Sequence, residues 1–142
     1  MRFQFAVLVL IGAFAFGGLP AGAHHSFDTE FDRDSPMEFD GTVSRFEWKN
    51  PHAYLYVDVI DDSGETQTWA LQMGAPTVMS RRLGWSPGSV SAGDTVHIAG
   101  FRARADDDYS GLAQLVTLPD GEILRASLAF QRSEGRSRRS PR

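Results

Sequence analysis

One stretch of alternating residues constrains the fold of this chain more than any other feature. From Met37 to Ser44, apolar and polar residues alternate, which is typical of a β-strand with one buried face. The apolar series then continues at Phe46 and Trp48, which have the opposite parity. A change of parity inside one continuous strand indicates a β-bulge, and a bulge bends a strand enough to help close a small barrel. We therefore expect a long, bent strand that ends at the turn residues Asn50-Pro51.

The segments after this strand predict further strands and one short helix. Residues 54–60 are rich in β-formers, residues 61–64 have the chemistry of a hairpin turn, and a strand pattern resumes up to residue 73. Residues 77–83 have helical spacing, with Thr77 as the expected N-cap and Gly84 as the expected stop. The remaining strand candidates are residues 95–101, 112–118 and 122–126.

This order predicts an all-β domain with one short helix between the third and fourth strands. It is the order of a five-stranded OB-like Greek-key barrel, a fold that commonly binds ligands on one face. An SH3-like barrel is the alternative, and the position of the helix disfavours it. The residues expected in the core share one parity within each strand, and they are Val43, Leu55, Val57, Trp69, Leu71, Val96 and Ile98.

Residues 1–23 have the pattern of a secretory signal peptide. Arg2 supplies a positive charge, residues 5–16 form an apolar stretch, and Ala21-Gly22-Ala23 offers an A-x-A cleavage site. An uncleaved anchor is the alternative, but Gly and Pro residues interrupt the apolar stretch before it reaches the length of a membrane span. We therefore expect a periplasmic or secreted protein that begins at His24 and does not span the membrane after cleavage.

Charge divides the exported part of the chain into three segments. Residues 24–35 form an acidic N-terminal segment, residues 36–126 form the expected barrel, and residues 127–142 form a basic tail that we expect to be disordered. The whole chain has a formal net charge of -4, and its body is strongly acidic because the tail holds five of the arginines. An acidic body repels phosphate backbones, so nucleic acid is not an expected partner.

Cleavage after Ala23 would also create a chelating group at the new N-terminus. Cysteine is absent, which removes disulfides, thiolate metal sites and cysteine nucleophiles. The α-amino group and the imidazole of His24 can bind one metal ion together, with His52 as the expected third nitrogen and His25 as a local competitor. Three nitrogens in a plane form a histidine brace, an arrangement that suits Cu(II). The alternative is a frayed terminus that binds no metal.

A second candidate site is an aromatic face on the outside of the barrel. Tyr54 and Tyr56 have the opposite parity to their buried neighbours, and His97 likewise points away from the core. An exposed aromatic face suits a small molecule, a glycan or a protein partner, and the alternative is that these rings are covered by the N-terminal segment or the helix. The residues expected at a ligand face are Asn50, Trp48, Tyr54, Tyr56 and His97.

Motifs of common enzymes are missing. The sequence contains no Gly-x-Ser-x-Gly, no phosphate-binding loop and no His-Glu-x-x-His. The preferred hypothesis is therefore an exported β-barrel binding module of unknown ligand that is not an enzyme. A periplasmic Cu(II)-binding protein that uses the histidine brace is the first alternative, and a small copper redox enzyme built on the same brace is the second.

Four short motifs also resemble a known group of proteins. They are His24-His25-Ser26-Phe27, the segment 47–52 with its Asn-Pro-His turn, Trp69-Ala70-Leu71 and the segment 92–96. In this combination the chain resembles a family of short exported bacterial proteins that is classed only as a domain of unknown function. The resemblance covers His24 to about Ala126 and leaves the basic tail outside. It implies a small extracytoplasmic β-barrel, and it implies no activity.

Overall fold

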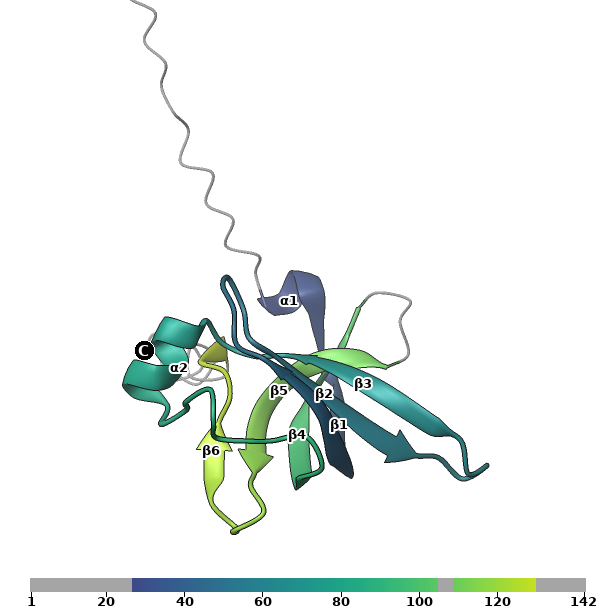
Figure 1. Cartoon of the computed structure of the whole chain (residues 1–142). Coiled ribbons are helices and arrows are strands. Elements are labelled where there is room, and N and C mark those ends of the chain that lie inside the picture. Colours follow the sequence, from purple (N-terminus) through teal and green to yellow (C-terminus); the bar gives the residue numbers. More distant parts are fainter. Residues whose placement is uncertain (1–26, 105–108, 130–142) are drawn as a thin grey trace, which may run out of the picture.

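The computed structural model of the chain describes residues 27–104 and 109–129. The predicted signal peptide, His24, His25 and residues 130–142 of the basic tail lie outside these residues. The described elements, in chain order, are α1 (Phe27–Glu30), β1 (Phe31–Glu47), β2 (Tyr54–Ile60), β3 (Thr66–Gln72), α2 (Pro76–Arg82), β4 (Thr95–Ala103), β5 (Ser110–Thr117) and β6 (Ile123–Arg125), as Figure 1 shows.

The strands form one sheet that closes into a ring. Its order is β3-β2-β1-β4-β5-β6, and an additional parallel pairing joins β3 to β5, where Ala70 faces Ser110 and Gln72 faces Leu112. All other neighbouring strands are antiparallel. The expected mostly antiparallel β-sheet with a short helix between the third and fourth strands is therefore confirmed.

The number of strands and the ends of the domain differ from the five-stranded barrel that was predicted for residues 36–126. β6 is a sixth strand of three residues that pairs with β5, and it lies within the strand candidate 122–126, although the five-stranded barrel order does not count it. β1 begins at Phe31, so the boundary expected at Pro36 falls inside this strand. The acidic residues hid its first part because alternating charges carry no apolar periodicity. Ser127 is also buried, one residue beyond the boundary that was expected at Ala126.

The bulge predicted from the change of parity is present in β1. The register with β2 shifts between Val43 and Arg45, so that Val43 faces Val57 and Arg45 faces Tyr56. The shift lies just after the end of the pairing with β4, because Thr42, which faces Thr95, is the last residue of β1 that pairs with β4. β1 can therefore pair with β4 through its first part and with β2 through its last part.

The core predicted from strand parity is confirmed. All seven residues expected there are buried, and Leu55, Val57, Leu71 and Ile98 are completely inaccessible. Trp85 closes the core beside α2 and donates a hydrogen bond from Nε1 to the Arg125 carbonyl oxygen at 3.0 Å.

The helix α2 differs from the prediction at its first turn. It begins at Pro76 with Ala75 as its N-cap, and no side chain caps it, so the expectation of Thr77 as the cap was wrong. A proline in the first turn needs no backbone partner for its missing N–H, which explains the earlier start. The predicted stop is correct, because Gly84 has a φ of 79°, a conformation that favours glycine.

The predicted hairpin turn after β2 is also present. The Asp61 carboxylate accepts hydrogen bonds from the Ser63 hydroxyl, the Gln67 amide and the backbone N–H groups of Ser63 and Glu65. These donors, led by the Ser63 hydroxyl, lower the pKa of Asp61 to about 2. No helix within the described residues is long and apolar enough to cross a bilayer.

The close approach of β4 to β5 generates a testable prediction. A Cβ atom at Gly100 would overlap the backbone carbonyl oxygen of Leu112, which cannot move without breaking the strand pairing. We expect Gly100→Ala to lower the free energy of unfolding by about 3 kcal/mol, as overpacking of a rigid site does. Gly88→Ala is the matched control, because nothing lies within 4 Å of its Cβ position and its φ is not positive. Urea denaturation of both variants checks this, and equal stabilities would contradict it.

Candidate functional site

Two tyrosines lie together on the outer face of β2. Tyr54 and Tyr56 alternate with the buried residues Leu55 and Val57, and their own side chains are half-buried. Their ring centroids are 6.4 Å apart with an interplanar angle of 30°. The placement that parity predicts for these two residues therefore agrees with the structure.

Charged and polar side chains complete this surface. The Arg45 guanidinium lies 3.9 Å from the centroid of the Tyr56 ring, a cation–π contact, and Arg45 also pairs with Glu47 at 2.9 Å. The Tyr54 hydroxyl donates a hydrogen bond to Gln72 Oε1 at 2.8 Å. We call these five residues, Arg45, Glu47, Tyr54, Tyr56 and Gln72, the tyrosine face.

The bulge in β1 is what brings Arg45 to this surface. Without the register shift after Val43, the residue facing Tyr56 would be Ser44. The parity change in the sequence indicates the bulge that brings Arg45 opposite Tyr56. The contact itself could be predicted only with the strand register, which the sequence does not show. Gln72 was missed for the same reason, since only the pairing of Tyr54 with Gln72 reveals it.

Electrostatics on the tyrosine face are set by near neighbours. Lys49 Nζ lies 2.7 Å from the second carboxylate oxygen of Glu47, and this hydrogen bond is the main reason that the pKa of Glu47 is lowered. The pKa of Tyr54 is raised, first by burial and then by the negative charge of Glu30 on α1. Tyr54 is therefore a neutral hydrogen-bonding group at neutral pH.

Trp48 and Asn50 lie beside the tyrosine face but do not form part of it. The Trp48 ring packs edge-on against Phe46 at 5.6 Å, and it covers the rim of the hydrophobic core. Asn50 is exposed in the turn between β1 and β2, where the Asn50–Pro51 peptide bond is cis. The structure thus separates these residues, which the sequence placed in one set.

His97 lies on β4, away from the tyrosines. It faces Asp40 in the strand register, five residues along β1 from Arg45, or about 16 Å at the rise of a strand. Its Nδ1 lies 2.8 Å from Asp40 Oδ1, and its Nε2 lies 3.0 Å from Glu38 Oε1. The Asp40 hydrogen bond is the largest contribution and raises the pKa of His97. Burial is the next largest and lowers this pKa, and the Glu38 hydrogen bond raises it further.

His52 has a different environment in the turn before β2. The side chain is half-buried, and its Nδ1 is buried without a hydrogen-bond partner. Figure 1 shows α1 and this turn at the same end of the ring, and the effect of Glu30 on Tyr54 requires α1 to be near the start of β2. No group of three His, Asp or Glu side chains suited to a metal ion occurs within residues 27–104 and 109–129.

Comparison with known proteins identifies a family for the chain. The model of a family of unknown function (DUF6152) matches residues 13–113. The chain belongs to this family. The resemblance inferred from the His-His-Ser-Phe and Asn-Pro-His motifs is thereby confirmed, and the family brings no activity with it. No curated protein matches the chain. No solved structure matches it either.

The His97 cluster predicts a pH dependence of stability. Because the pKa of folded His97 is raised above its ordinary value of 6.5, the imidazolium stabilises the fold below that value. This contribution is lost as the pH rises through the raised pKa. We expect the melting temperature difference between wild type and His97→Gln to be larger at pH 5.5 than at pH 8.5. Asp40→Asn should remove most of that pH dependence, and an equal difference at both pH values would contradict the assignment.

Proposed function

We propose that this protein is an exported, non-catalytic module that binds a carbohydrate on the tyrosine face of an OB-like barrel. The observation that carries the proposal is the neighbouring pair Tyr54 and Tyr56 with Arg45 above Tyr56, on the outside of a closed sheet. The predicted signal peptide in residues 1–23 supports a periplasmic or secreted location.

The strand pairings support the OB-like part of the proposal. β1 pairs with both β2 and β4, β4 pairs with β5, and a parallel pairing of β3 with β5 closes the ring. The helix α2 lies between β3 and β4. This combination supports an OB-fold over an SH3-like barrel, and OB-folds bind oligosaccharides and oligonucleotides on the face of their second and third strands. In an OB-like barrel the tyrosine face would occupy that position.

The chemistry of the tyrosine face favours a sugar over the other partners. Aromatic rings offer flat apolar surfaces to the C–H face of a sugar, while the guanidinium of Arg45 and the amide of Gln72 can bond to its hydroxyl groups. The acidic body disfavours nucleic acid. A partner strand is disfavoured because Ala70–Gln72 on the outer edge of β3 are already paired with β5.

Loss of one ring provides the test of this proposal. We expect the mature protein to bind chitotetraose, a soluble oligomer of N-acetylglucosamine, and Tyr56→Ala to weaken that binding about tenfold, which is about 1.4 kcal/mol. Tyr56→Phe is the matched control, because it keeps the ring and should bind nearly as tightly as wild type. Calorimetric titration measures both. Unchanged affinity in Tyr56→Ala, or no binding of chitotetraose or maltotetraose, would rule the proposal out.

A Cu(II) site at the turn between β1 and β2 is the second candidate function. The observation that favours it is the buried, unpartnered Nδ1 of His52, because a buried nitrogen without a hydrogen bond is costly unless it binds something. α1 begins at Phe27 near this turn, only three residues after His24 in the chain. His24 and His52 would hold the metal, and His25 could replace one of them. With copper bound, the protein would act either as a Cu(II)-binding protein or as a small redox enzyme.

Titration with Cu(II) separates a formed site from a terminal chelate. We expect the mature protein that begins at His24 to bind one Cu(II), and one added N-terminal residue to weaken binding by at least tenfold. His52→Ala should weaken it as well, while the control His97→Ala should not. Affinity should fall at acidic pH, because the amine and imidazoles must lose their protons to bind. If the added residue has no effect, the brace is wrong, and turnover of oxygen with a reductant would identify the enzyme alternative.

A further inference from the structure

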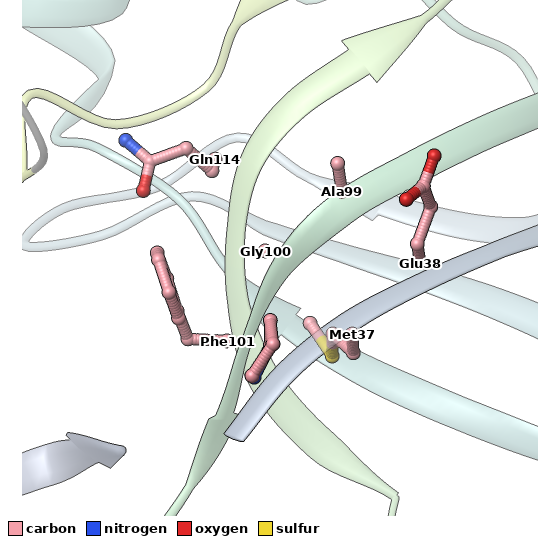
Figure 2. A pocket seen from close by; sticks show the side chains of 7 residues that line it. Met37, Glu38, Ala99, Gly100, Phe101 and Gln114 are labelled. Atoms are coloured by element: carbon pink, nitrogen blue, oxygen red, sulfur yellow. The ribbon is translucent and has the colours of Figure 1, made fainter. Parts of the chain in front are cut away.

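A pocket lies where β1, β4 and β5 meet. Its volume is about 410 Å³, in the range of sites for small molecules. The small residues Ala99 and Gly100 lie at its centre, and the larger lining residues are Pro36, Met37, Glu38, Phe101 and Gln114. Figure 2 shows Phe101 and Gln114 projecting to the same side of the strands.

Gln114 lies at a bulge in β5. Ala99 faces Leu115 and Gly100 faces Ala113, so Gln114 between them has no facing residue on β4. Its backbone carbonyl oxygen still accepts a hydrogen bond from the Ala126 N–H at 2.8 Å, which holds the bulge against the end of β6. Bulges often redirect a side chain next to a binding site.

The amide of this side chain has no partner. Gln114 is 7% exposed, and both Oε1 and Nε2 are buried without a hydrogen bond. Nearly all buried polar side chains in folded proteins are satisfied, so a glutamine that leaves both a donor and an acceptor unpaired is unusual. An apolar residue of the same shape would avoid this cost, which indicates that the amide serves a ligand rather than the fold.

The surroundings of the amide restrict the charge of that ligand. Glu38 at the edge of the pocket is an exposed carboxylate, and it disfavours an anion. The apolar residues Met37, Pro36 and Phe101 disfavour a buried cation, because a charge without a partner is costly to remove from water. The ligand chemistry that remains is a neutral molecule with an apolar body.

The geometry points to a small, flat lactam as the ligand of this pocket. A primary amide presents its donor and acceptor side by side on one edge. A cyclic amide does the same, because its ring holds N–H and C=O on one side, so the two can form a pair of hydrogen bonds. The ring of the lactam would lie over Ala99 and Gly100, and, because both amide atoms of Gln114 are buried, its polar edge would reach them once the lining side chains move apart. This site is independent of the proposed carbohydrate face.

A pair of probes that differ by one methyl group tests the inference. 2-Quinolone carries the lactam edge, and N-methyl-2-quinolone lacks its N–H donor while keeping the same flat body. In two-dimensional ¹H–¹⁵N spectra of the full mature chain, we expect 2-quinolone to shift the backbone signals of Ala99 and Gly100 and the side-chain amide signals of Gln114. N-methyl-2-quinolone should bind at least tenfold more weakly.

Variants distinguish pairing with the amide from general apolar binding. Gln114→Met keeps the shape of the side chain and should fold with at least wild-type stability, yet it should lose the preference for 2-quinolone over its N-methyl form. Gln67→Met is the matched control on β3 and should keep the preference. Equal binding of the two probes, retained preference in Gln114→Met, or no shifts at the pocket with either probe would each overturn the inference. None of these outcomes depends on the tyrosine face.

Discussion

Strand β1 changes partners part-way along its length, and the closed ring depends on this change. Its first part, from Phe31 to Thr42, pairs with β4, and its last part, from Thr42 to Glu47, pairs with β2. At the crossing, Val43 exchanges backbone hydrogen bonds with the segment before β4, through Asp94 and Gly93. The bulge that follows turns the strand while keeping Val43 in the core. Because β1 pairs with both β2 and β4, β3 and β5 come close enough to pair, and this pairing closes the sheet.

Strand parity accounts for how much of this fold the sequence reveals. Residues such as Val57 and Ile98 alternate with polar neighbours, so their burial follows from a period of two. The parity change before Phe46 gave the bulge by the same argument. The pairing of β3 with β5 has no such signal, because it joins segments about forty residues apart and depends on the completed ring. The charged start of β1 shows no apolar period either, so the sequence does not reveal this part of the strand.

The candidate sites could be predicted only in part, because strand parity does not show how the strands pair. Parity says which face a side chain is on, so it placed Tyr54, Tyr56 and His97 outside the core. It does not say which strand lies next to them or in what register. His97 therefore proved to contact Asp40 and Glu38 rather than the tyrosines.

The two most informative side chains, Arg45 and Gln114, both sit at breaks in the alternation. Arg45 follows the bulge of β1, and Gln114 is the unpaired residue of the bulge in β5. Regular pairing would have put the small polar residue Ser44 opposite Tyr56 and Gln114 opposite Gly100. A bulge costs strand hydrogen bonds, and it is retained where it aims a side chain that a regular strand cannot aim. At one bulge a cation lies against an aromatic ring, at the other a buried amide is left unpaired, and the two bulges lie on different strand pairs.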